Sequence, residues 1–151
     1  MAGKNGKTNG AITSLTQLPS RDLPVTIEIE GQDEMIVIPC RALTFRRYQE
    51  IGRMVPDVAP PTMAGKNGIL YDWQNPEYKA KQEAVQEQRN MLRLAEFVQA
   101  DIPGNTLQDK ADYIANELEM GVVYALKSAM DKTMQGGGAS VSAREANFQP
   151  V

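Results

Sequence analysis

Apolar residues recur at intervals of three and four over two long stretches, and this spacing restricts the fold more than any other feature of the sequence. In the second stretch the apolar positions are Leu107, Ala111, Ile114, Leu118, Val122, Ala125 and Ala129. Such spacing gathers apolar side chains on one face of a helix, which can then pack on another helix. Thr106 and Asp109 resemble a capping box, and Gly121 is expected to mark a bend or a close helix contact. The pattern predicts one long helix over residues 107–134.

The other long stretch covers residues 76–100 and begins at a strong helix start. Asn75 can cap the helix, Pro76 suits the first helical position, and Glu77 faces the positive end of the helix dipole. Apolar residues crowd into the second half of this stretch, whereas the segment from Lys79 onward is nearly all polar for three turns. We therefore expect a solvated first half and a second half that joins the core.

Strand patterns appear only before these helices. Residues 25–30 alternate apolar and polar positions, which predicts a strand with Val25, Ile27 and Ile29 on its inner face. After four turn residues, the uninterrupted apolar run 35–39 predicts a second strand that is buried on both faces. Because an isolated hairpin is marginally stable in water, this hairpin should lie on the helices.

A shorter helix is expected between the hairpin and the long helices. Thr44 can cap it, and it would carry Phe45, Tyr48 and Ile51 on one side. The segment 55–74 is punctuated by prolines and glycines and is predicted to be a long loop. The predicted fold class is therefore α+β and mostly helical, with an N-terminal β-hairpin packed on about three α-helices.

The distribution of small and polar residues suggests one domain with two loose ends. Residues 1–22 are expected to form a flexible N-terminal tail, residues 23–134 a single helical domain, and residues 135–151 a flexible C-terminal tail. The hexapeptide Met-Ala-Gly-Lys-Asn-Gly occurs at residues 1–6 and again at 63–68, and the sequence offers no physical account of this repeat.

Composition argues against several classes of function. The chain has no histidine and a net charge of −3, so zinc chemistry, histidine catalysis and nucleic-acid binding are not expected. Cys40 follows an apolar strand and is interpreted as a buried structural thiol. The acidic residues Glu28, Glu30, Asp33 and Glu34 do not match a calcium loop and are interpreted as a solvated hairpin edge. We predict no catalytic, cofactor-binding or metal-binding residues, and hence no enzyme.

Targeting signals also bear on where the protein works. No apolar run is long enough to span a membrane, and the first ten residues do not match a secretory signal. We therefore expect no membrane partner and a reducing, cytoplasmic setting.

Two groups of residues are candidates for contact with a partner protein. Methionines gather near the end of the last predicted helix, and their flexible side chains suit adaptable surfaces, although they can equally fill the core. Two aromatic residues of the long loop could anchor a partner or pin the loop to its own helices. The candidate partner-binding residues are Val122, Leu126, Met130, Met134, Tyr71 and Trp73. On the helix we expect binding near Met130 and packing near Leu118.

The order of these elements resembles that of a known family. Arg41-Ala42-Leu43-Thr44 announces a short helix after the hairpin, and Tyr71-Asp72-Trp73-Gln74-Asn75-Pro76-Glu77-Tyr78 follows a Pro-rich loop and opens a long charged helix. From Leu23 to Met134 the chain resembles the tail assembly chaperones of long-tailed bacteriophages, which often show an Asp-Pro-x-Tyr helix start. Here Asn75 stands where aspartate is more typical.

The resemblance implies a function in binding and not in catalysis. A protein of this family binds the tape measure protein in the host cytoplasm, keeps it soluble while tail tube subunits polymerise around it, and leaves before the virion is complete. The tail tube protein is a further candidate partner, and self-association into a homo-oligomer is left open. The alternative is a structural virion component, a head-to-tail connector or minor tail protein retained in the virion tail. A weaker alternative is a small regulatory domain or an enzyme subunit that acts through carboxylates alone.

Overall fold

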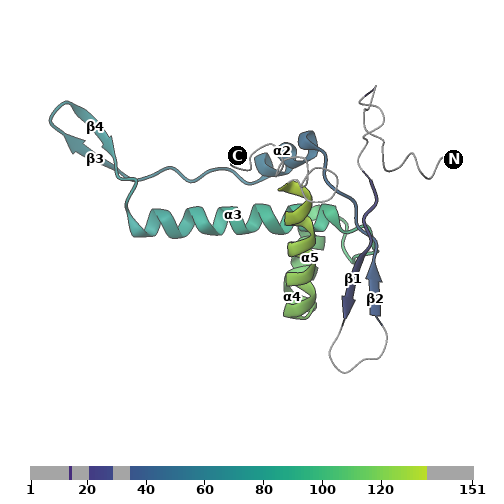
Figure 1. Ribbon diagram of the computed structural model, residues 1–151. Coiled ribbons are helices and arrows are strands. Elements are labelled where there is room, and N and C mark those ends of the chain that lie inside the picture. The colour runs from purple at the N-terminus through teal and green to yellow at the C-terminus, as the bar shows by residue number, and fades with distance from the viewer. Residues whose placement is uncertain (1–13, 15–20, 29–34, 136–151) are drawn as a thin grey trace, which may run out of the picture.

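The computed structural model describes residues 14, 21–28 and 35–135, and its fold is α+β and mostly helical, as predicted (Figure 1). The two predicted tails fall almost entirely outside these residues, and so does Ile29 of the predicted first strand. The elements in chain order are β1 Val25–Glu28, β2 Met35–Ile38, α2 Phe45–Met54, β3 Thr62–Gly65, β4 Gly68–Tyr71, α3 Pro76–Phe97, α4 Leu107–Glu117 and α5 Met120–Met134.

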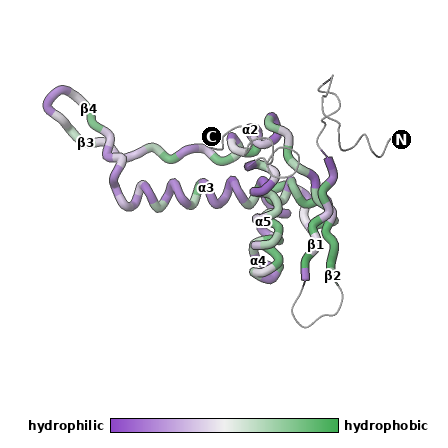
Figure 2. Tube along the Cα trace, in the orientation of Figure 1, coloured by the Kyte–Doolittle hydropathy of each residue, from purple (hydrophilic) through white to green (hydrophobic). Residues whose placement is uncertain are grey.

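Helix α3 is the axis of the molecule, and its two halves lie in different surroundings. Its 22 residues span about 33 Å. In the second half Leu94 and Phe97 have no exposed surface, and α2, α4 and α5 all pack against this helix. The first half is hydrophilic and extends away from the body of the protein (Figures 1 and 2). Asn75 caps the helix by accepting from the backbone N–H of Tyr78 at 2.9 Å, so the predicted start and polarity are confirmed.

The N-terminal hairpin pairs β1 and β2 in antiparallel register, with Val25 opposite Ile38. Val25 and Ile27 are buried, as their alternation predicts. The expectation that the second strand is buried on both faces is wrong, since Met35 is 62% exposed and Val37 is 58% exposed. Helix α5 packs against β1, so most of β2 remains in water.

Pairing between these two chain segments continues beyond the named strands. Asp22 and Arg41 form a bridge and an ion pair of 2.8 Å, and the Leu23 N–H donates to the Cys40 carbonyl at 2.7 Å. The paired region therefore begins two residues before the predicted domain boundary at Leu23, since Arg21 also accepts a backbone hydrogen bond.

The chain that leaves α3 adds a third segment to this sheet. Cys40 and Val98 form an antiparallel bridge, and the Arg41 N–H donates to the Phe97 carbonyl at 2.8 Å. Because the two segments are distant in sequence, this contact ties the N-terminal hairpin to the end of α3.

The segment predicted to be a long loop contains a second β-hairpin, which corrects that prediction. Strands β3 and β4 pair in antiparallel register around a two-residue turn, Lys66-Asn67. Gly68, which follows the turn, has a φ of +126°, a conformation that favours glycine. The second copy of the repeated hexapeptide, residues 63–68, thus builds most of β3 and the turn. We call β3, β4 and their turn the arm, because they stand away from the rest of the protein (Figure 1).

An extended segment between α2 and the arm runs back along α3 (Figure 1). The Arg89 guanidinium donates to the Val55 carbonyl at 2.7 and 3.2 Å and pairs with Asp57 at 2.8 Å. Farther along, the Val58 N–H donates to the Gln82 side chain at 3.4 Å. These contacts hold the segment against the helix, and we call it the strap, residues 55–61.

The helix predicted over residues 107–134 is two helices, which corrects that prediction. The capping box at its start is confirmed, with the Asp109 N–H donating to Thr106 at 3.1 Å. The chain becomes extended at Leu118, and α5 starts at Met120. Gly121 has open space where a Cβ would lie, so it marks no close helix contact. The break separates α5 from α4 and brings α5 onto β1.

Candidate partner-binding surfaces

The face of α5 that carries Val122, Leu126 and Met130 lies inside the protein. Leu126 and Met130 are 1% and 2% exposed, and Val122 packs against the same core while partly buried. Because α5 lies against β1 and α3, its apolar face meets the protein's own elements. The expectation that the Met130 end is kept for a partner is therefore corrected. The Met130 side chain fills the core, which is the alternative interpretation given above for the methionines.

The two aromatic candidates near the arm are both accessible. Tyr71 is 55% exposed and Trp73 is 57% exposed. The rings of Tyr71 and Trp73 lie 6.0 Å apart, and Trp73 meets the edge of Tyr78 on α3, also at 6.0 Å. Trp73 thus contacts its own helix and still leaves more than half of its surface exposed.

The last candidate, Met134, lines an apolar groove between α2 and α5. Met134 is 40% exposed and Phe45 is 79% exposed. The groove has a volume of about 370 Å³, and we call it the α2–α5 groove, lined by Leu43, Thr44, Phe45, Tyr48, Thr133 and Met134.

Phe45 is the most exposed large apolar side chain of the described residues. The prediction that it lies on the same side of the helix as Ile51, which is fully buried, is wrong. Residues six positions apart on an α-helix are separated by a net rotation of about 240° around the helix axis, so the side chains of Phe45 and Ile51 point to different sides. This angular separation is the sequence signal that could have identified Phe45 as exposed.

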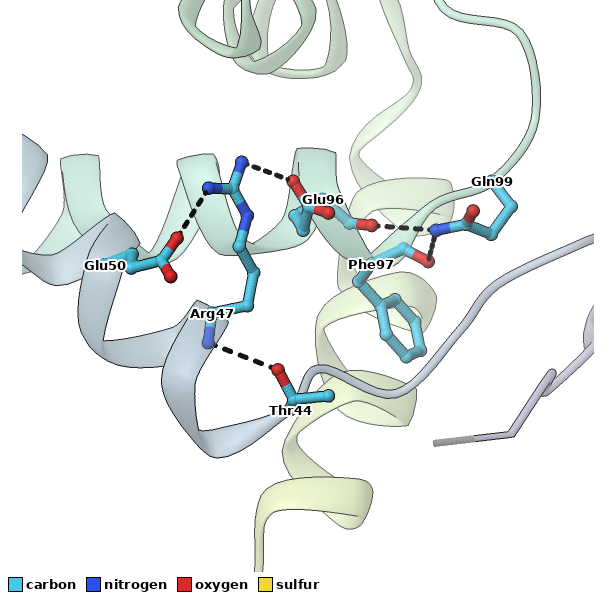
Figure 3. A network of polar contacts seen from close by, with 6 residues as sticks. All are labelled: Thr44, Arg47, Glu50, Glu96, Phe97 and Gln99. Carbon is cyan, nitrogen blue, oxygen red and sulfur yellow. Dashed lines mark hydrogen bonds and ion pairs between the residues drawn. The ribbon is translucent and has the colours of Figure 1, made fainter. Parts of the chain in front are cut away.

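Figure 3 shows polar contacts that cap α2 and hold it on α3. Thr44 caps the helix by accepting from the Arg47 N–H at 3.2 Å. The Arg47 side chain pairs with Glu96 of α3 at 2.9 Å and with Glu50 at 3.3 Å. The hydrogen bond to Glu96 contributes most to raising the pKa of Arg47 above its usual value. Because Phe45 is in the same first turn, these contacts also set its position.

A buried cation lies behind Tyr48 in the wall of the groove. The Arg93 guanidinium lies over the Tyr48 ring, 3.6 Å from its centroid, and donates to the Tyr48 carbonyl at 3.4 Å. Burial lowers the pKa of Arg93. A Cβ on Gly52 would lie 2.7 Å from this guanidinium, so glycine permits the close approach of α2 and α3. The cation–π contact thus orients Tyr48, one wall of the groove.

Cys40 has the properties of an inert core residue. It is 1% exposed, and burial raises the pKa of its thiol to about 11. The structure therefore confirms the sequence prediction of a shielded thiol. In the described ranges no three His, Cys, Asp or Glu residues cluster as metal ligands would, and no helix there is suited to crossing a membrane. Of the acidic residues considered for calcium, Glu30, Asp33 and Glu34 lie outside these ranges.

Comparisons of the chain with protein-family models, with curated proteins and with solved structures found no match. The α2–α5 groove presents apolar and hydroxyl side chains, which suit the burial of an apolar side chain from another molecule.

Proposed function

We propose that this protein is a bacteriophage tail assembly chaperone that binds the tape measure protein, keeps it soluble and supports polymerisation of the tail tube. It acts in the host cytoplasm, as a binding protein and not as an enzyme, and it uses no cofactor. The order of elements that resembles this family supports the proposal. The observation that carries it is the exposed apolar surface of the α2–α5 groove, centred on Phe45.

The groove suits a helical client. A helix can lay its apolar face into an apolar groove and insert one or two anchoring side chains. Phe45 and Met134 supply a rigid and an adaptable contact, respectively, on the two sides of the groove. An apolar client segment covered in this way cannot aggregate through the same surface, which is how binding keeps the client soluble.

Substitution of Phe45 by glutamate tests the groove. Phe45 is the first residue of α2, and the first turn of that helix contains no acidic residue. A glutamate at this position should interact favourably with the positive end of the helix dipole, so the substitution should preserve the fold. Loss of the contact that Phe45 would bury against the client should weaken client affinity by roughly tenfold or more. The measurement is the soluble fraction of the tape measure protein on co-expression with wild type or Phe45→Glu.

Met120→Glu is a matched control for this experiment. Met120 is also the first residue of a helix, is 69% exposed, and lies outside the groove, and the first turn of α5 likewise contains no acidic residue. We expect it to keep the client soluble. If Phe45→Glu melts like the wild type and solubilises the client equally well, the groove is not the client site.

Mass spectrometry of purified particles separates the chaperone from a structural virion component. A chaperone that leaves before completion should be absent from intact virions but present in lysates of infected cells. Its recovery in particles at a fixed ratio to a tail protein would favour a head-to-tail connector or minor tail protein.

A further inference from the structure

The arm is a two-stranded sheet with apolar side chains on both faces. Alternation along β4 places Ile69 and Tyr71 on one face and Leu70 on the other, with exposures of 71%, 55% and 56%. Met63 lies opposite Leu70 and is 46% exposed. A two-stranded hairpin is at best marginally stable alone in water, and this one packs on no layer of helix in the described residues.

The two edges of the arm differ in how readily they accept another strand. The Asp72 N–H donates to the Pro61 carbonyl at 2.8 Å, which fixes the alternation of inward and outward backbone groups. It follows that Ile69 and Tyr71 direct their backbone N–H and C=O groups outward from β4, while Thr62 and Ala64 do so from β3.

Prolines protect only one of these edges. Pro60 and Pro61 immediately precede β3, and Pro60 has no N–H to offer at the next outward position. Neither strand itself contains a proline or a charged residue, the features that usually discourage edge pairing, so the difference lies in the flanking segments, and residues 72–75 after β4 contain no proline. The unprotected edge of the arm is therefore β4.

We propose that a second copy of this chain pairs with β4, so that two arms form one antiparallel four-stranded sheet. The two-fold axis passes between Leu70 and Leu70 of the second copy. Ile69 then lies opposite Tyr71 of the second copy, and Tyr71 opposite Ile69, so the outward backbone groups of both strands meet as hydrogen-bonded pairs.

The register is self-complementary in its side chains as well. Each Ile69 meets a tyrosine across the strands on one face of the sheet, a favourable pairing of a β-branched with an aromatic residue. Asp72 lies opposite Gly68 of the second copy, and Lys66 lies opposite Gln74, so no like charges face each other. This match within the chain's own sequence identifies a second copy as the occupant of the edge.

The short strand makes the association weak. An edge of four residues buries less than the roughly 1,200 Å² that separates stable interfaces from transient ones. The dimer should therefore form reversibly in the micromolar range, and its population should follow protein concentration. Formation of the dimer does not depend on the proposed function. A dimer would carry two α2–α5 grooves, which could bind a long client bivalently.

Proline substitutions on the two edges test the dimer. The N–H of Ile69 points outward, so Ile69→Pro should remove only intermolecular contacts, namely hydrogen bonds and the pairing of Ile69 with Tyr71 of the second copy, and Ala64→Pro is the corresponding change on β3. Sedimentation velocity over a concentration series should show the wild type and Ala64→Pro passing from monomer to dimer, with the dissociation constant of Ile69→Pro at least about tenfold higher. Circular dichroism checks that both variants keep their helix content.

A wild type that stays monomeric at all concentrations, or equal effects of the two prolines, would overturn the proposal. Cross-linking then tests the register without relying on proline. Leu70→Cys should form a disulfide-linked dimer under mild oxidation, because facing residues at the axis lie within disulfide range. Met63→Cys lies on the far strand and should not, and the wild type, whose thiol is buried, controls for Cys40. Equal cross-linking of the two variants would contradict β4 pairing.

Discussion

The regions at the two ends of α3 both contain large apolar side chains, but these are buried at one end and exposed at the other. At the C-terminal end Leu92, Leu94 and Phe97 are at most 4% exposed, and three other helices pack around them. At the N-terminal end the arm leaves Ile69 and Tyr71 more than half exposed. Apolar content alone therefore does not distinguish core from interaction surface. The distinction depends on whether another element of the same chain reaches the site.

Truncation of Phe97 should produce the largest loss of stability. This side chain is fully buried, so Phe97→Ala should reduce the free energy of unfolding by about 3–5 kcal/mol through lost burial and a cavity. Ile69→Ala on the arm should change it by no more than about 0.5 kcal/mol in dilute solution. Urea denaturation followed by circular dichroism measures both, and similar losses would remove the contrast between the two ends.

An intermediate effect is expected at the strap that joins the two ends. Arg89→Ala removes two hydrogen bonds to the carbonyl of Val55, a buried residue, and should cost about 1–3 kcal/mol. In Arg89→Ala, the amide hydrogen exchange of residues 55–61 should be faster than in the wild type, whereas the exchange of the Phe97 amide should change little. Arg53→Ala, an exposed arginine on α2, is the control. Exchange that accelerates equally throughout would mean that the strap is not a separate unit.

The effect expected at Cys40 is absent at neutral pH and appears only at alkaline pH. Burial raises the pKa of the thiol from 9.0 to about 11, so the folded state holds this proton more tightly than the unfolded state. The resulting stability is complete below pH 9 and is lost as the pH rises toward 11. The difference in unfolding free energy between wild type and Cys40→Ala should therefore narrow over this range. A constant difference would show that the thiol is not shielded.

Local signals in the sequence correctly predicted the starts of three helices. Thr44, Asn75 and Thr106 cap helices as expected, because a cap depends on a few neighbouring residues. The arm was missed because its strands have only four residues each and lie among prolines and glycines. Asn67-Gly68 is a hairpin signal that could have identified it.

The burial of Met130 could not be read from local pattern. A stripe at helical spacing looks the same whether it faces the protein's own core or a partner, and the outcome here depends on the break at Leu118, which brings α5 onto β1. The exposure of Phe45 likewise depends on how Arg47 and Glu96 fix α2 on α3. These are tertiary effects between distant segments.

The bridge between Cys40 and Val98 also has a consequence for synthesis on the ribosome. At about 5–20 residues per second, translation reaches Val98 roughly 3–12 s after Cys40. During this interval the nascent hairpin lacks its third segment, and helix α5, which covers β1, has not yet been made. Folding of the body is thus governed by contacts of long sequence separation, which form slowly. The N-terminal hairpin is translated first but completed late, so the newborn chain exposes its own apolar strands until α5 has been made.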